Sequence, residues 1–258
     1  MDSFLLARLT EWLDGYIKGF YREDGPLQSN ILLKEGHIHR VRENMATLAG
    51  DLGLGMPESA LGEAVALLHD VGRFPQIEAY GTYNDAASVD HAILGVLIVR
   101  REGLLSSLPK DERRRICQAI ALHNRYSLPP RSAKKRLIRM VRDADKLDIL
   151  RIVSAHHVGE GQNPALDLGL PHLPGYTPKL LKDVLEGRMA RMVDAASVND
   201  LKLLYLSWIW DINYPSTIAR IEKEGYMEAI MGELPITAKI DRLRHTVRLR
   251  LSSSSPSR

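Results

Sequence analysis

Two polar neighbours, His69 and Asp70, interrupt a stretch of sequence that is otherwise largely apolar, ALLHDVGRFPQ at residues 66–76. The side chains around this pair leave almost no polar face, so the segment is expected to be buried. Burying an unpaired carboxylate or imidazole costs several kcal/mol or forces a pKa shift. The pair therefore needs compensation from elsewhere in the chain or from a bound ion.

Four further residues could take part in that compensation, because they are of the same types and fall on other predicted helices. They are His37, His91, His123 and Asp145. Histidine and carboxylate side chains on facing helices build metal sites in the cores of helical bundles. A divalent cation would neutralise the carboxylates and take neutral imidazole nitrogens as ligands.

Asp70 is suited to bridge two ions. Adjacent residues of a helix point about 100° apart, so His69 and Asp70 cannot both point straight at one ion. They can flank it, and the second oxygen of Asp70 can then reach another ion. This geometry suggests a two-metal centre bridged by Asp70.

The segments that must position these residues have the periodicity of helices. No period-2 segment bounded by hairpin signals is found, which argues against a sheet. Ser88 is the expected N-cap of the helix that carries His91. The predicted helices cover residues 3–21, 30–52, 57 to beyond 70, 88–103, 110–124, 132–157, 178–197, 200–214, 216–232 and 235 onward. The sequence therefore predicts an all-α fold, a multi-helix bundle with additional C-terminal helices.

The chain has no repeat and no clean linker, so we expect one unit with four parts. Residues 1–29 form an N-terminal helix packed on the core, and residues 30–157 form the metal-binding helical core. Residues 158–250 contain a Gly- and Pro-rich loop and a C-terminal helical part of the same unit. Residues 251–258 are expected to be a disordered tail.

The composition excludes several classes of protein. The 258 residues are 45% apolar and 26% charged, as in ordinary soluble proteins, and the net charge of +3 gives no clear nucleic-acid signal. The single cysteine, Cys117, cannot form a disulfide within the chain. No signal peptide or bilayer-spanning run is found. We expect a cytoplasmic protein without membrane contact, and its oligomeric state is left open.

Five short motifs in order carry a family resemblance: HIHRV, LLHDVGRF, SVDHAILG, IALHNR and RDADKLD. Together they resemble the HD-domain superfamily of metal-dependent phosphohydrolases over roughly residues 30–157. The first histidine of that family usually stands three residues before an Arg and four before a Val. His37 fits this pattern and His39 does not, so His37 is taken as the ligand.

The resemblance implies a set of site residues and a type of reaction. The expected metal ligands are His37, His69, Asp70, His91, His123 and Asp145. One or two divalent transition metal ions (Fe, Mn, Zn, Co or Ni) would be the cofactors. The expected activity is hydrolysis of a small phosphoester, such as a nucleotide, by a metal-bound hydroxide. Asp70, Arg73 and Lys146 are the expected catalytic residues. Arg73 and Lys146 are also the expected substrate-binding residues, although either could instead be an ion-pair partner.

Departures from the family patterns leave other functions open. The Gly-Tyr-Pro motif of cyclic-dinucleotide phosphodiesterases is missing after His123. Gly72, Arg73 and Phe74 occupy the stretch where alarmone hydrolases have a Glu-Asp pair. Arg73 stands where one-metal deoxynucleotidases have a glutamate. Some HD-domain relatives use the same ligands in a mixed-valence diiron oxygenase, which is one alternative. A non-catalytic, nucleotide-sensing HD domain is another. Asp148, three residues after Asp145, could orient a ligand or be solvated or ion-paired.

Overall fold

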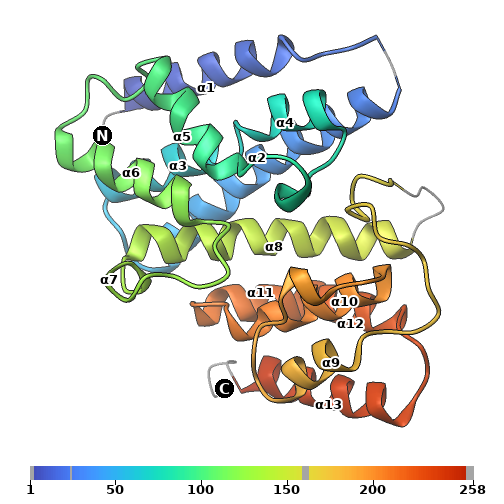
Figure 1. The fold of residues 1–258 in the computed structure, drawn as a ribbon. Coiled ribbons are helices and arrows are strands. Elements are labelled where there is room, and N and C mark those ends of the chain that lie inside the picture. Colours follow the sequence, from blue (N-terminus) through green and yellow to red (C-terminus); the bar gives the residue numbers. More distant parts are fainter. Residues whose placement is uncertain (1–2, 24, 159–162, 254–258) are drawn as a thin grey trace. The chain divides into compact units, whose positions relative to one another are not determined.

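The chain folds mainly into α-helices in the computed structural model, which describes residues 3–23, 25–158 and 163–253 (Figure 1). No β-strand occurs in these ranges, and the predicted all-α fold is confirmed. The chain divides into two compact units, Met1–Asp148 and Ile149–Arg258. The predicted division into four parts stays a prediction.

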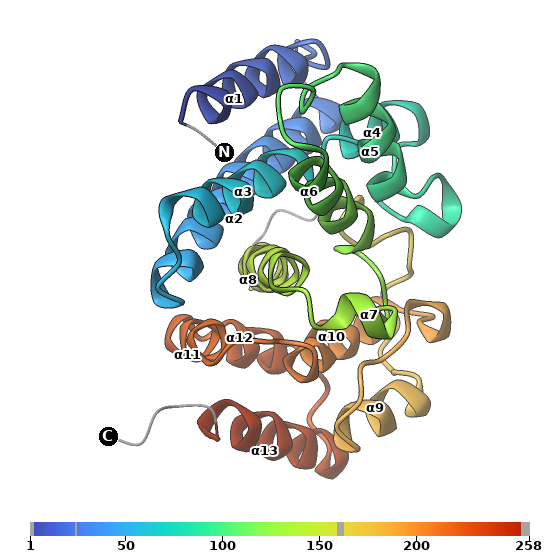
Figure 2. The ribbon, with the colours of Figure 1, turned by 90° about the vertical axis from the view of Figure 1, so that its left-hand side faces the viewer.

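The first unit is built from α1 to α7 and the first part of α8. The helix bounds are Ser3–Lys18 (α1), Pro26–Asp51 (α2), Met56–Leu68 (α3), Arg73–Tyr80 (α4), His91–Arg101 (α5), Lys110–Leu122 (α6), Pro130–Ala133 (α7) and Arg136–Val158 (α8). α2 packs against α3 and α4, α3 also contacts α1 and α6, and α5 contacts α4 and α6. Figure 2 looks along α8 and shows α2, α3 and α6 beside it. Asn44 of α2 donates a hydrogen bond to the carbonyl of Ala144 in α8.

The start of α5 differs from the prediction. Asp90, and not Ser88, is its N-cap, because the Asp90 carboxylate accepts hydrogen bonds from the backbone N–H groups of Ala92 and Ile93. The residues before it form a short 3₁₀ helix, Asp85–Ala87. His91 is consequently the first residue of α5, and its side chain is buried.

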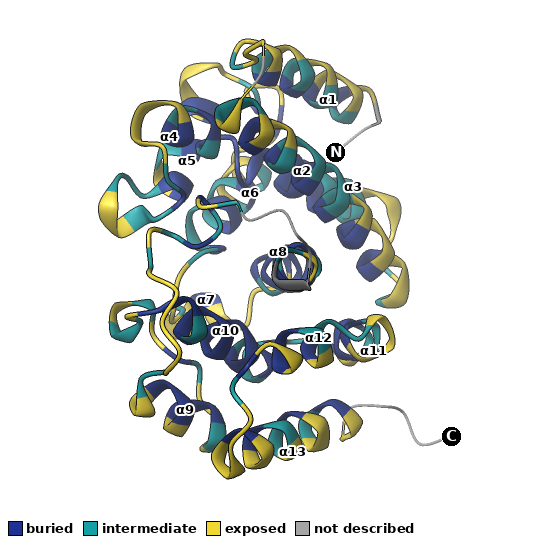
Figure 3. Cartoon of the chain, turned by 90° about the vertical axis from the view of Figure 1, so that its right-hand side faces the viewer, coloured by how far each residue is buried: buried dark blue, intermediate teal, exposed yellow. Residues whose placement is uncertain are grey.

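The His69-Asp70 pair lies in a turn between two helices. α3 ends at Leu68 and α4 begins at Arg73, whereas the sequence predicted one helix through the pair. The hydroxyl of Tyr16 in α1 donates to the carbonyl of Val71 at 3.2 Å, so α1 packs over this turn. Buried residues occur along α2 and α3, and α1 carries both buried and exposed residues (Figure 3).

The second unit contains the rest of α8 and five further helices. Their bounds are Pro178–Leu185 (α9), Val198–Ser207 (α10), Pro215–Glu224 (α11), Tyr226–Gly232 (α12) and Ala238–Ser252 (α13). α9 is shorter than predicted, because the chain leaves the helix and passes through Gly187 with φ of 76°. Short 3₁₀ helices follow at Met192–Asp194 and Trp208–Trp210. Residues 159–162 of the predicted loop and 254–258 of the predicted tail lie outside the described residues.

Gly72 allows α5 to approach the turn that carries Asp70. A Cβ atom added at Gly72 would lie 2.2 Å from the carbonyl oxygen of His91 and 2.9 Å from the backbone nitrogen of Gly95. The backbone angles of Gly72 are ordinary, with φ of −70° and ψ of −15°. The lack of a side chain, and not an unusual conformation, is therefore what this position requires.

We predict that Gly72→Ala lowers the free energy of unfolding by about 1–3 kcal/mol, because backbone must move to admit the methyl group. Gly50→Ala is the control, since Gly50 lies in α2 with no atom within 4 Å of an added Cβ. That change should stabilise by about 0.5–1 kcal/mol. Urea unfolding measures both, and equal stability of the two variants would contradict the packing described for Gly72.

Candidate metal centre

The six predicted ligands converge, although from different positions in their helices than expected. His37 and Asp145 lie within α2 and α8. His69 and His123 each follow the last residue of a helix, α3 and α6, with helical backbone angles. The prediction that these two lie inside helices was wrong, because the chain turns away directly after each of them. All six residues are at most 8% exposed.

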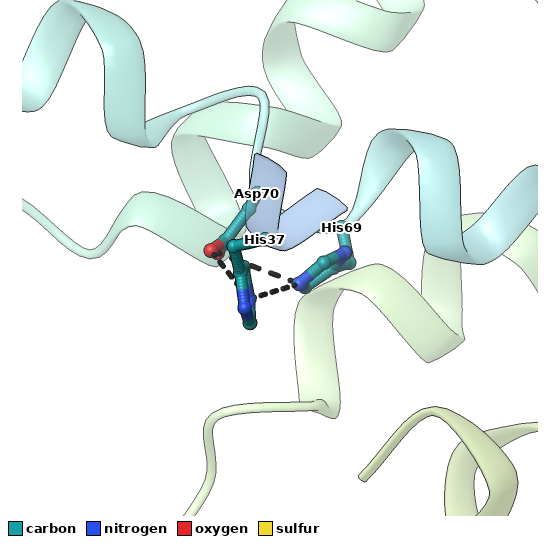
Figure 4. Close-up of side chains that lie close together, drawn as sticks. All are labelled: His37, His69 and Asp70. Atoms are coloured by element: carbon teal, nitrogen blue, oxygen red, sulfur yellow. Dashed lines mark hydrogen bonds and ion pairs between the residues drawn. The ribbon is translucent and has the colours of Figure 1, made fainter. Parts of the chain in front are cut away.

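One oxygen of Asp70 faces the first pair of histidines (Figure 4). Asp70 Oδ2 lies 3.5 Å from His37 Nε2 and 3.7 Å from His69 Nε2. Asp145 Oδ1 lies 3.1 Å from His37 Nε2 and 3.7 Å from His69 Nε2. Two imidazole nitrogens and two carboxylate oxygens are thus gathered on this side of Asp70.

The other oxygen of Asp70 faces the second pair of histidines. Asp70 Oδ1 lies 3.2 Å from His91 Nε2 and 3.7 Å from His123 Nε2. The two Nε2 atoms are 3.1 Å apart. Asp70 therefore stands between two pairs of histidines and presents a different oxygen to each, which is the arrangement that a bridging carboxylate requires.

Each of the four histidines has an acceptor at its Nδ1 atom. His37 Nδ1 is 2.8 Å from Asp148 Oδ2, and His91 Nδ1 is 2.7 Å from Asp85 Oδ2. His69 and His123 meet backbone carbonyls three residues earlier, each at 2.7 Å. These acceptors favour a proton on Nδ1, so the Nε2 lone pairs point to the centre of the cluster. Asp148 thus contacts His37 and also forms an ion pair with Arg40, so it has features of both roles considered from the sequence.

This donor set fits divalent metal ions. Three fully buried groups drawn from the six residues have ligand atoms within 4.8 Å of one another: His37, His69 and Asp70; His69, His123 and Asp145; and Asp70, His91 and His123. Imidazole nitrogen and carboxylate oxygen without thiolate suit Mn, Fe, Co, Ni or Zn. The cluster could therefore hold metal ions, and their number and identity stay a prediction.

The electrostatics of the cluster keep its carboxylates ionised. Burial alone would raise the pKa of Asp70, but Lys34 and the histidines His69, His123 and His91 together lower that pKa, so that it lies well below its ordinary value. Burial is outweighed at Asp145 in the same way, because His37 and His69 lower its pKa. Burial lowers the pKa of His123, which favours the neutral imidazole that a metal binds.

Arg73 lies beside Asp70 and is held by the loop that precedes α5. Its Nη1 donates to the carbonyl of Tyr83 at 2.7 Å, to Asp85 Oδ1 at 2.9 Å and to Gln76 Oε1 at 2.7 Å. Its Nε lies 3.6 Å from Asp70 Oδ1. This Nε is buried and has no hydrogen-bond acceptor in the described part of the chain. Arg73 therefore presents one unsatisfied N–H to the site.

A second cation, Lys34, was missed by the sequence analysis. Its Nζ lies 2.8 Å from Asp70 Oδ2, and the side chain is 11% exposed. Lys34 stands one helical turn before His37 in α2, and that spacing is the signal that could have identified it. Its Nζ also lies 5.3 Å from the centre of the Tyr83 ring, and the guanidinium carbon of Arg73 lies 5.7 Å from the same centre.

Lys146 follows Asp145 in α8 and is buried, with 7% exposure. Its predicted contact with substrate stays a prediction. Asp148, one turn after Asp145, also accepts a hydrogen bond from Arg40 Nε at 2.6 Å. The carboxylate that orients His37 is therefore itself held by an arginine of α2.

A model of the HD-domain family matches residues 35–150. Residues 35–150 are an HD domain. The matched range contains all six clustered residues and both predicted substrate cations. HD domains are mostly metal-dependent phosphohydrolases, so the match supports a metal-dependent hydrolase type of function. No curated protein and no solved structure matches the chain. Among the described helices, none combines the length and the apolar character that crossing a bilayer would need.

The second pair of histidines yields a test of metal number. The double change His91→Ala and His123→Ala should lower the metal content from about two ions per chain to about one, because the ligands on the other side of Asp70 remain. His39→Ala is the control, since His39 belongs to none of the clustered groups found among the described residues. Metal analysis after loading and desalting gives the readout, with circular dichroism as the folding check. A wild-type protein that holds one ion in excess metal, unaffected by the double change, would contradict the two-ion arrangement.

Proposed function

We propose that this protein is a metal-dependent phosphohydrolase that acts on a small phosphoester, such as a nucleotide. The observation that carries the proposal is the buried Nε–H of Arg73, which lacks an acceptor in the described residues and stands beside Asp70. Leaving such a donor unsatisfied costs about 1–3 kcal/mol. An oxygen of an anionic substrate would satisfy it and would interact with the guanidinium charge.

The residues of the site would have different roles in such a reaction. Bound divalent ions would supply a water of lowered pKa and would polarise a phosphoryl oxygen. Asp70 would be shared between the ions, and the four histidines would bind through Nε2. Arg73 would orient the phosphoryl group and neutralise charge that develops in the transition state. The buried surroundings strengthen each of these interactions.

Lys34 and Lys146 are the further candidates for contact with substrate. Lys34 Nζ pairs with Asp70 Oδ2, the oxygen that faces His37 and His69. The Lys34 ammonium group is therefore a candidate partner for a substrate phosphate beside Asp70. Lys146 is adjacent to Asp145 and remains the second cation proposed from the sequence.

One experiment separates the proposal from the two alternative functions. Protein purified without oxygen is loaded with Mn²⁺ or Fe²⁺ and given a panel of phosphomonoesters, phosphodiesters and nucleotides, with and without O₂. We expect phosphate release or diester cleavage that is independent of O₂. Turnover that consumes O₂ and stops without it would indicate the diiron oxygenase. Nucleotide binding without turnover would indicate a sensor.

Arg73→Ala should retain the metal content of the wild type and lose at least tenfold in kcat/KM for the phosphoester, because a charge-assisted hydrogen bond to the substrate disappears. Arg101→Ala is the control, since Arg101 is an exposed arginine of α5. Steady-state kinetics and metal analysis on the same samples provide the measurement. Unchanged kcat/KM would show that Arg73 is only an ion-pair partner.

A further inference from the structure

Asp85 is a carboxylate outside the predicted ligand set that connects four side chains near the site. It lies in the 3₁₀ helix of the loop between α4 and α5. Its oxygens lie 2.7 and 2.8 Å from His91 Nδ1, and they accept from Arg73 Nη1 at 2.9 Å. They also accept from Gln76 Nε2 at 2.9 Å and Asn124 Nδ2 at 3.0 Å. Asp85 therefore contacts both a clustered histidine and Arg73.

The contact with His91 decides which ring nitrogen carries the proton. A carboxylate accepts hydrogen bonds and cannot donate when ionised. Asp85 therefore holds the proton of His91 on Nδ1 and leaves the Nε2 lone pair, 3.2 Å from Asp70 Oδ1, for an ion. Without this acceptor the ring could place its proton on Nε2, where it would block a metal bond.

The contact with Arg73 decides which of its N–H groups remains for a substrate. Asp85, Gln76 and the carbonyl of Tyr83 all accept from Nη1, so that end of the guanidinium is bound to the loop. The Nε–H is the group left beside Asp70. Asp85 thereby fixes a histidine and an arginine on the same side of Asp70.

We propose that Asp85 is a positioning residue that couples the second metal subsite to the substrate-binding arginine, by orienting His91 and Arg73 through one carboxylate. The role of Arg73 in this coupling rests on the proposed phosphohydrolase function. The role of His91 rests only on its contacts, and it can be tested on metal-free protein.

Asp85→Asn is the informative variant, because it keeps the shape and removes the charge. The new amide can donate to His91 Nδ1, which favours the tautomer protonated on Nε2. Nitrogen-15 NMR of histidine-labelled, metal-free protein should show His91 protonated on Nδ1 in the wild type and shifted toward Nε2 protonation in the variant. Titration with Mn²⁺ should show the second ion bound about 10- to 100-fold more weakly and the first ion unchanged.

Asp90→Asn is the matched control. Asp90 lies on the same loop next to His91, caps α5 and pairs with Arg125, and asparagine is an equally good N-cap. Asp85, Asp90 and His91 also form a partly exposed group of possible ligands. If both variants lose one ion equally, Asp85 is a ligand of a further ion, and the positioning role is overturned. The positioning role is also overturned if the Asp85→Asn variant keeps the wild-type tautomer of His91 and the wild-type affinity for the second Mn²⁺ ion.

A double-mutant cycle tests whether Asp85 acts through His91. In protein that already carries His91→Ala, the change Asp85→Asn should have no further effect on Mn²⁺ affinity. Fully additive effects would contradict the proposal. If the wild type cleaves no phosphoester and the tautomer and metal results are still as expected, the proposed function fails while the effect of Asp85 on His91 stands.

Discussion

The buried carboxylate of Asp70 is the interaction on which this structure depends. It is 2% exposed, and its two oxygens face two different pairs of histidines. A carboxylate in such a place has to be compensated by several groups at once. Lys34 at one oxygen and Arg73 near the other provide part of this within the chain. The histidine nitrogens around both oxygens are potential ligands for metal ions, which would provide the rest.

The fold serves this carboxylate by fixing the direction of each imidazole ring. His69 and His123 stand at the ends of α3 and α6, where a carbonyl three residues back accepts from Nδ1. These two orientations are local and follow from the end of a helix. His37 and His91 depend instead on Asp148 and Asp85, which lie on other elements. The orientations of His37 and His91 therefore require the tertiary structure. We expect them to be more sensitive to substitution than those of His69 and His123.

Residue chemistry and order, together with the resemblance to the HD-domain superfamily, were enough to predict the six clustered side chains, and helical periodicity was enough to predict the all-α fold. The charge of Asp70 in an apolar segment had to be neutralised, and the histidines on other apolar segments were candidate ligands for an ion that would do so. The residues that contact and orient these six side chains could not be predicted. Asp85 lies in a polar loop whose sequence has no periodicity, and its distance to Arg73 is set by the turn after α4. Lys34 has helical spacing to His37, but a lysine on a helix usually faces solvent.

Helix ends were the other difficulty, and each has a local physical cause. Ser88 and Asp90 are both good N-cap residues, and only the packing of the loop against Gln76 and Asn124 decides between them. Gly187 adopts a positive φ shortly after α9, and the predicted longer helix did not allow for it. The second unit packs α9 against α10 and α13, and α11 against α12 and α13, through apolar faces. All six clustered residues belong to the first unit.

Anomalous X-ray diffraction from crystals loaded with Mn²⁺ would test the central claim most directly. The account predicts two peaks about 3.5–4 Å apart, with one oxygen of Asp70 bonded to each. One ion should be held by His37, His69 and Asp145, and the other by His91 and His123. A single peak in fully loaded crystals, or two peaks that do not share Asp70, would contradict it.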